Sequence, residues 1–495
     1  MPRRAASSTL VLPHRQPDQP ATRWLYTTVR EAILQGRLRP GKQIPATREL
    51  ARRYGLSRGT IVAAFDQLTS EGYLEARSGS GTFVARVLPD RLLQAPRPPR
   101  STQPVERRLP RRLSEYGRRL QLFPNLQPGP IRAFRTDQPA LDLFPTTLWA
   151  QVASRRLRRV SMDLLLACGP MGYRPLQEVV ADYLTTSRGV VCAAEQVAIV
   201  SGVQEALDLV GRILLESGDR TVIENPGYIG ATLAFEALGA TVVPAGVDGE
   251  GIILDDASLR GARLVYLTPA HQFPLGVSMS LARRLAVLEW ARSTGSMIFE
   301  DDYDSEYRYS GRPVPALQGL DRHGLVLFAG TFSKVLFPSL RLGYLVVPPD
   351  LVDSFAAAQS VTNRHAPLLE QAILTDFIAD GHFGRHVRRM REVYAERLGV
   401  LIESARERLK GLLDVSEVEA GLQTAGWLQR GIDGPVAAEA ASLRHVEVTP
   451  LVRYGRGGVA RGGLHLGFAA VDPREIRRGI RELAGALESV KTGPV

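Results

Sequence analysis

The feature that most constrains the fold is an alternation, after about residue 135, of short apolar runs with longer helical patterns. Segments such as Gln204–Glu216 and Leu281–Ser293 have apolar residues at helical spacing and separate the short runs. This alternation predicts βαβ units around a mainly parallel sheet, with a smaller α/β lobe in the final ~110 residues. The predicted strands are Val197–Ser201, Thr221–Glu224, Thr241–Pro244, Leu264–Thr268, Ser296–Glu300, Val326–Ala329 and Leu342–Val347.

The rest of the chain divides into three predicted parts. Residues 1–20 are expected to be a flexible tail. Residues 21–85 have two helical patterns and then a hairpin, which is typical of a small compact domain. Residues 86–134 are rich in Pro and Arg, so we expect a basic, semi-rigid linker with a short helix near Leu113–Leu122. Residues 135–490 then form the α/β domain.

Within residues 21–85, two short helices meet at a turn around Gly55. Thr47 and Ser57 are expected to cap the two helices, and Val62, Phe65 and Leu68 to form the core face of the second one. A glycine-tipped hairpin follows, so the order is that of a winged helix-turn-helix, whose second helix meets base edges. A small helical interaction domain is the alternative. The candidate DNA contacts are Arg48, Arg58, Thr60, Ser78, Gly79, Ser80 and Gly81.

The net charge of +11 and the pI near 9.9 favour a polyanionic partner, although a solvated basic surface has the same composition. Two cysteines do not make a disulfide framework, and a reducing, cytoplasmic compartment fits them best. The eight histidines lack zinc-ligand spacing, so no metal site is expected. No apolar run is long enough for a membrane span.

One segment of the α/β domain carries several groups that pyridoxal phosphate requires. In LVLFAGTFSKVLFPSLRLGYLVV, a strand is followed by Thr331, Ser333 and Lys334, with Arg341 seven residues after the lysine. Lys334 is the candidate for the Schiff base, and the two hydroxyls and Arg341 are candidates for binding the phosphate. An ordinary exposed lysine is the alternative for Lys334.

Three further segments supply the remaining groups. Asp301 and Tyr303 end a predicted strand, where they could meet the pyridine nitrogen and the ring oxygen. Gly202, Val203 and Gln204 begin a helix whose free N–H groups suit a phosphate. Tyr228 could stack on the ring. A solvated strand end and a plain core tyrosine are the respective alternatives.

The order of these motifs carries a resemblance to a known family. The stretch PGKQIPATRELARRYGLSRGTIVAAFDQLTSEGYLEARSGSGTFV resembles the GntR winged-helix regulators, and residues 140–485 resemble fold-type I aminotransferases. Together they resemble the MocR subfamily of GntR regulators. The resemblance implies an internal aldimine at Lys334, promoter DNA as partner, a head-to-tail homodimer, and an amine, amino acid or pyridoxal phosphate as effector.

Several positions depart from the aminotransferase pattern. Phe273 stands where many relatives have an Asn for the ring oxygen, and His271 or Gln272 is the expected substitute. Cys168 replaces a tyrosine that reaches the partner's phosphate, and His465 lies near the usual site of a substrate-carboxylate arginine. Arg453 is the next candidate for anchoring an effector carboxylate. Gly230 stands where a GABA-responsive member has Arg, which argues against GABA.

Three functions follow from these residues. The first is a transcription regulator that senses an amine, an amino acid or the cofactor, for an operon of vitamin B6 or amine metabolism. The second is a working aminotransferase that carries a DNA-binding module, which the missing Asn and uncertain arginine disfavour. The third is a cofactor-free scaffold, against which the retention of Lys334, Asp301, Tyr303 and Arg341 argues.

Overall fold

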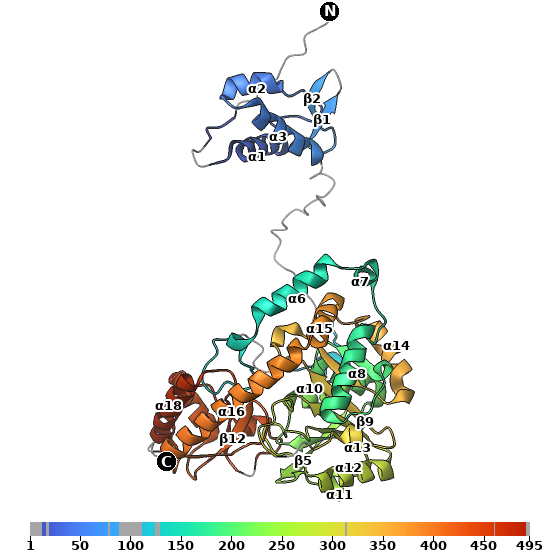
Figure 1. Ribbon diagram of the computed structural model, residues 1–495, viewed down its shortest axis with the longest axis vertical. Helices are drawn as coiled ribbons and strands as arrows, with labels where there is room; N and C mark the ends of the chain where they lie inside the picture. The colour runs from blue at the N-terminus through green and yellow to red at the C-terminus, as the bar shows by residue number, and fades with distance from the viewer. Residues whose placement is uncertain are drawn as a thin grey trace, which may run out of the picture. The chain divides into compact units, whose positions relative to one another are not determined.

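The computed structural model describes residues 12–15, 19–77, 80–88, 111–123, 129–311, 314–459 and 461–491 of the 495-residue chain. The chain divides into two compact units, Met1–Arg111 and Arg112–Val495. Each unit has its own hydrophobic core, and each is described here by itself (Figure 1).

The first unit is a three-helix bundle with a two-stranded hairpin. Its elements are α1 (Ala21–Leu34), α2 (Thr47–Tyr54), α3 (Arg58–Ser70), β1 (Leu74–Arg77) and β2 (Gly81–Val84). Gly55 ends α2 in the left-handed region, with φ of 63°, and Ser57 caps α3 by accepting a hydrogen bond from the Thr60 N–H at 3.0 Å. The order helix, turn, helix, hairpin is that of a winged helix-turn-helix.

Two details of this unit differ from the sequence-based expectation. Thr47 is the first residue of α2 and not its cap, because Ala46 occupies the cap position and no side chain caps the helix. Val62 is 37% exposed, whereas Ile61 is fully buried. The core side of α3 is therefore Ile61, Ala64, Phe65 and Leu68, a spacing that puts Ile61 and not Val62 on the inner face.

The larger unit is built on an eight-stranded sheet of order β3-β10-β9-β8-β7-β4-β5-β6. Five neighbouring strands, β9, β8, β7, β4 and β5, run parallel, which confirms the mainly parallel sheet. Every predicted strand is present, and β6 is an additional short antiparallel strand. The bounds are β3 Val197–Val200, β4 Arg220–Asn225, β5 Thr241–Asp248, β6 Gly251–Ile252, β7 Ala262–Leu267, β8 Met297–Asp302, β9 Val326–Thr331 and β10 Gly343–Val346.

Helices pack against both faces of this sheet. Phe299 and Leu327 lie in one core cluster with residues of α9, α10 and α14, whereas Ile298 and Val326 lie in another with residues of α12. Neighbouring residues of a strand therefore face opposite layers, as the period of two requires. The helices that cover the sheet are α9 Val203–Leu214, α10 Ile229–Leu238, α11 Asp256–Leu259, α12 Leu281–Thr294, α13 Leu317–Leu320 and α14 Val352–Thr362.

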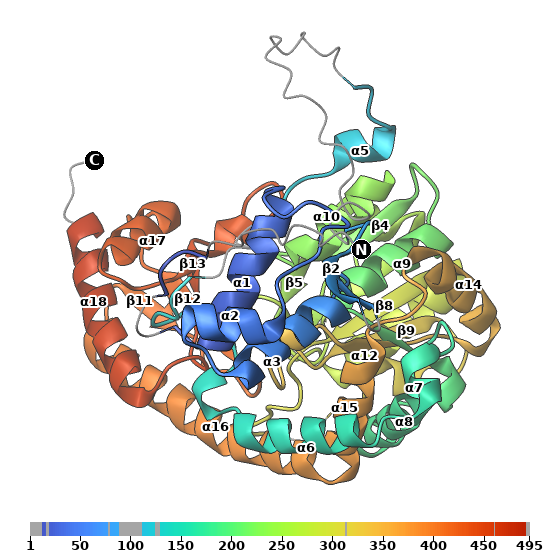
Figure 2. The ribbon, with the colours of Figure 1, turned by 90° about the horizontal axis from the view of Figure 1, so that it is seen from above.

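A smaller C-terminal lobe carries an antiparallel sheet of order β11-β12-β14-β13. The long helix α16 packs beside α18 of this lobe, as Figures 1 and 2 show. The bounds are α16 His382–Arg408, β11 Leu413–Val415, β12 Gln423–Leu428, α17 Gly434–Leu443, β13 Thr449–Pro450, η5 Leu451–Tyr454, β14 Gly463–Gly467 and α18 Pro473–Lys491.

The segment before the large sheet belongs to the larger unit. The expected short helix is α5 (Glu115–Arg119), and it packs against α10. Ala133 and Phe134 are fully buried and form isolated bridges to Val446 and Gly467 of the C-terminal lobe. The next helices of this unit are α6 Thr146–Arg158, α7 Met162–Leu166, α8 Arg174–Arg188 and α15 Leu368–Ala379. Helix α15 packs between α6 and α8 (Figure 1).

Candidate functional site

A pocket of about 310 Å³ opens at the carboxyl ends of the parallel strands. Asp301 near the end of β8 and Thr331 at the end of β9 line it, as does the start of α9. The C-terminal lobe closes the opposite side with Thr449, Arg453 and Tyr454. Ligands of open α/β sheets bind at this edge.

Eleven of the thirteen candidate residues for cofactor or effector binding line this pocket. They are Gly202, Val203, Gln204, Tyr228, Asp301, Tyr303, Thr331, Ser333, Lys334, Arg341 and Arg453. Neither His271 nor Gln272 lines it, and His271 lies behind Tyr303, so it is not in direct reach of a molecule in the pocket.

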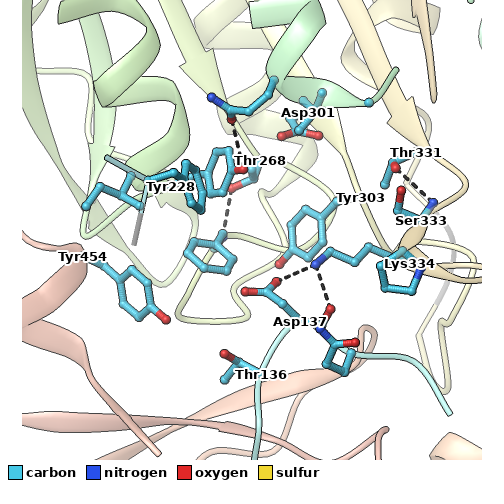
Figure 3. A pocket seen from close by; sticks show the side chains of 18 of the residues that line it. Thr136, Asp137, Tyr228, Thr268, Asp301, Tyr303, Thr331, Ser333, Lys334 and Tyr454 are labelled. Atoms are coloured by element: carbon cyan, nitrogen blue, oxygen red, sulfur yellow. Dashed lines mark hydrogen bonds and ion pairs between the residues drawn. The ribbon is translucent and has the colours of Figure 1, made fainter. Parts of the chain in front are cut away.

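Lys334 points into the pocket and is held there by Asp137 (Figure 3). Its Nζ donates to the backbone oxygen of Asp137 at 2.9 Å and to Oδ1 at 3.0 Å. Burial opposes ionisation of Asp137, but the charge of Lys334, together with hydrogen bonding from Lys334 and Gln423, outweighs burial and lowers the pKa of this carboxyl group. Sequence reasoning missed Asp137, because it lies 197 residues from Lys334 and no local pattern marks it.

Asp301 is buried, and only one of its two carboxyl oxygens has a hydrogen-bond partner among the described residues. Its Oδ2 accepts a hydrogen bond from the Tyr266 hydroxyl at 2.6 Å, whereas Oδ1 has no partner among the residues that the structure describes. Burial raises the pKa of Asp301 to about 7. An unpartnered, desolvated carboxyl oxygen on the wall of a pocket is suited to a cationic N–H group from a ligand.

A buried relay of hydrogen-bonded side chains runs from Tyr303 through His271 to Asp304, with Tyr303 on the pocket side. Its hydroxyl lies 3.1 Å from Nδ1 of His271, and the same nitrogen lies 3.0 Å from Oδ1 of Asp304. Asp304 is fully buried and also accepts from the Leu422 N–H at 3.1 Å. His271 therefore orients the Tyr303 hydroxyl, and Asp304 ties both to the C-terminal lobe.

The other end of the pocket is built for an anion. Gly202 precedes α9 with φ of 112°, and an added Cβ would lie 3.4 Å from Nη2 of Arg341. The positive φ favours glycine there, and the Arg341 guanidinium lies at van der Waals distance from the position of an added Cβ. The buried Ser333 hydroxyl has no partner within the described ranges. A helix start, an arginine and a free hydroxyl suit a phosphate.

Aromatic rings form the remaining wall. Tyr228 packs edge-on to Phe273 at 5.8 Å between ring centroids and donates to Oε1 of Gln204 at 3.1 Å. A Cβ at Gly230 would lie 2.4 Å from that Oε1 and 2.5 Å from the Tyr228 ring. A side chain at this position would therefore require Gln204 and Tyr228 to move from the positions in which they line the pocket.

The residues that depart from the aminotransferase pattern lie either on the pocket wall or away from it. Phe273 lines the pocket, so an aromatic ring stands where relatives have an Asn. His465 is fully buried behind Phe273 and Tyr454, with ring centroids 5.3 and 5.4 Å away. Burial lowers the pKa of His465 to about 4, so this position carries no charge at neutral pH. Cys168 is half-buried and does not line the pocket.

In the first unit, the candidate DNA contacts lie on the surface around α3. Arg48, Arg58 and the wing residues Ser80 and Gly81 are exposed, and Thr60 is partly exposed. Ser78 and Gly79 lie outside the described residues. The Gln43 side chain donates to the backbone oxygen of Ser80 at 2.7 Å and so holds one side of the wing tip. Sequence reasoning had not singled out Gln43.

Two other kinds of feature do not occur in the described part of the chain. None of its helices has the length and apolar character to span a membrane. It also contains no group of three or more His, Cys, Asp or Glu side chains that could hold a metal ion.

Comparison with known proteins agrees with this architecture. Residues 22–84 match the bacterial regulatory proteins of the gntR family, and residues 141–425 match aminotransferase class I and II. The chain is 41% identical to the "Probable rhizopine catabolism regulatory protein MocR" of Rhizobium meliloti over 97% of this chain and 96% of the relative. It is 32% identical to the HTH-type transcriptional regulator TauR of Rhodobacter capsulatus, over 93% and 95%.

A solved structure of similar fold is LysN, the alpha-aminoadipate aminotransferase of Thermus thermophilus, complexed with N-(5'-phosphopyridoxyl)-L-leucine. The TM-score is 0.67 at 29% identity, over 73% of this chain and 92% of LysN. A winged helix-turn-helix joined to an aminotransferase unit defines a class of transcription regulator. Within that class, the chain belongs to the MocR-type regulators of the GntR family.

Proposed function

We propose that this MocR-type regulator binds pyridoxal phosphate at Lys334 and uses the loaded pocket to sense an amine or amino acid. The observation that carries the proposal is the pairing of a pocket lysine with an unsatisfied, buried acid: Lys334 lines the same pocket as Asp301, whose Oδ1 has no partner among the described residues. Bound pyridoxal phosphate supplies an aldehyde that reacts with amines and a pyridine ring that withdraws electrons.

The residues present fit this cofactor. Asp301 would face the pyridine nitrogen, whose positive charge removes the penalty that burial places on the carboxylate. Tyr303, oriented by His271, would donate to the ring oxygen, and Tyr228 would stack on the ring. The phosphate would bind Arg341, the start of α9 and two hydroxyl side chains, one at the end of β9 and one just beyond it. The residues at the start of α9 are Gly202, Val203 and Gln204, and the two hydroxyl residues are Thr331 and Ser333.

The rest of the proposal concerns partners. Arg453, exposed at the pocket edge, is the candidate for holding a distal acidic group of the effector. Arg58 and Thr60 would read bases of promoter DNA, while Arg48 and the wing hold phosphates. The protein would act in the cytoplasm as a homodimer, which we propose to be head-to-tail by resemblance to its subfamily.

The cofactor site is tested by the visible absorbance of the purified protein with added pyridoxal phosphate. The wild type should show the band of a lysine-bound cofactor, and Lys334→Ala should lack it while still binding DNA. The matched control is Lys410→Ala, since Lys410 is an exposed lysine of the same unit. Absence of any band in the wild type, even with excess cofactor, would overturn the account of this pocket.

A working aminotransferase is the second candidate, because the pocket keeps Lys334 together with Asp301 and Tyr303. Phe273 in place of an Asn and the uncharged His465 weigh against efficient turnover. Sustained keto-acid release with an amino acid would favour this candidate, whereas a spectral change without release would favour the sensor.

A further inference from the structure

Asp137 presents two oxygens to one ammonium group. Its backbone oxygen and its Oδ1 both accept from Nζ of Lys334, at 2.9 and 3.0 Å. Asp137 has φ of 66°, a left-handed conformation that is uncommon for a residue with a side chain. The Gln423 side chain accepts from its backbone N–H at 3.0 Å, so the C-terminal lobe holds this residue in place.

The electrostatic surroundings of Asp137 favour a cation and disfavour a second anion. The Lys334 ammonium is the charge that most lowers its pKa, and hydrogen bonding from Lys334 and Gln423 adds to this effect. His465 is itself neutral at pH 7, because burial lowers its pKa to about 4. Arg135, another cation that lines the pocket, lies 3.8 Å from Glu447 and donates to the backbone oxygens of residues 129 and 130.

The side chains beside Asp137 carry aromatic rings and hydroxyl groups. Tyr454 and Tyr303 flank it in Figure 3, with Thr136 below, and Phe273 completes the wall. These groups accept or donate hydrogen bonds and pack against carbon, but they carry no positive charge.

We propose that Asp137 binds the ammonium group of the effector, and that the effector is a primary amine without a carboxylate on the amine-bearing carbon. This inference rests on the proposed function, under which the Lys334 nitrogen is engaged by the cofactor and leaves Asp137 without its ammonium partner. In an α-amino acid the nitrogen and the carboxyl carbon lie only about 2.5 Å apart, since both bond to one carbon. An α-carboxylate would therefore be placed against the Asp137 carboxylate, and like charges repel.

The test uses matched pairs that differ only in the α-carboxylate: cadaverine and lysine, putrescine and ornithine, tyramine and tyrosine, phenethylamine and phenylalanine. Binding to the full-length, cofactor-loaded protein is measured by isothermal titration calorimetry. Among pairs that bind, the amine should bind at least ~10-fold more tightly than its amino acid, a difference of about 1.4 kcal/mol.

Asp137→Asn should reduce that preference to within about twofold by removing the repelling charge. Asp142→Asn is the matched control, because Asp142 is an exposed acid five residues away that does not line the pocket, and the preference should persist in it.

Two results contradict the inference alone. One is an amino acid that binds as tightly as its amine, or more tightly. The other is the absence of binding by every amine in a protein that still shows the cofactor band and binds operator DNA. Loss of the cofactor band in the wild type would instead overturn the proposed function, and the inference with it.

Discussion

At the scale of single residues, a buried carboxyl group with a raised pKa on a pocket wall marks a candidate position for a cationic group of a ligand. Burial raises the pKa of Asp301 to about 7, and it does the same for Glu224, which the Thr268 hydroxyl contacts at 2.7 Å. A carboxyl group with a pKa near 7 is about half protonated at neutral pH, and a nearby cation favours its ionised form. Of the two, Asp301 lines the pocket and Glu224 does not, which is why the cofactor role is assigned to Asp301.

The first prediction concerns Asp301→Asn in the cofactor-free protein. Because the folded pKa of Asp301 is raised above its unfolded value near 4, its stability contribution falls as pH rises from about 4 to about 7. The variant should therefore gain stability relative to the wild type between pH 5 and pH 8, by roughly 2–3 kcal/mol, because about two pH units of that range lie below the raised pKa. Thermal unfolding at both pH values measures this, with Asp142→Asn as the exposed control. An unchanged difference between the two pH values would show that Asp301 is already ionised.

The second prediction concerns Gly421, which lies against the relay behind Tyr303. A Cβ there would lie 2.1 Å from Cε1 of His271 and 2.7 Å from Oδ2 of Asp304. Gly421→Ala should displace His271, lower Tm and weaken cofactor binding. Gly411→Ala is the matched control, because Gly411 also has positive φ, 77° against 94°, but open space around it. Equal losses in both variants would mean that backbone strain alone is responsible.

At the scale of elements, α3 brings its first turn to the surface of the small unit. Arg58 and Thr60 lie in that turn, which the Ser57 cap fixes, while Ile61 and Phe65 anchor the other side in the core. A helix held in this way presents a rigid end to the major groove.

We predict that Arg58→Ala weakens binding to an operator selected from a random library by roughly 1–3 kcal/mol and relaxes preference at one base pair. Arg48→Ala should weaken operator and random duplexes alike, because a phosphate contact carries no sequence information. Fluorescence anisotropy titrations separate the two effects. A uniform loss for Arg58→Ala would remove it from the base-reading set.

Element positions followed from the sequence more readily than the site did. The strands were predictable because apolar runs such as that ending at Ala329 are buried on both faces. On the core face of α3, Phe65 and Leu68 are buried as predicted, but Val62 is exposed and its neighbour Ile61 is buried instead, because the sequence alone does not show which of two adjacent apolar residues faces inward. Asp137 and Gly421 reach the site only through tertiary folding, and no local motif marks such contacts.

At the scale of the whole molecule, the chain joins a DNA-binding unit to a ligand-binding unit and carries a net charge of +11. Basic side chains release counterions when they meet phosphates. We predict that log affinity for any duplex falls linearly with log salt, and that Arg48→Ala reduces the slope by about 1. A flat salt dependence would contradict a phosphate-contacting surface.

Under the proposed function, ligand chemistry at Lys334 changes DNA binding by the other unit. A ligand shifts such an equilibrium only if it binds the two states with different affinity. The most direct test is the operator affinity of the wild type and of Lys334→Ala, each measured without cofactor, with pyridoxal phosphate, and with pyridoxal phosphate plus the amine that binds best. We expect wild-type affinity to change several-fold across these conditions, while Lys334→Ala binds the operator with constant affinity. An equal response in both proteins, or no response in the wild type, would contradict the claim.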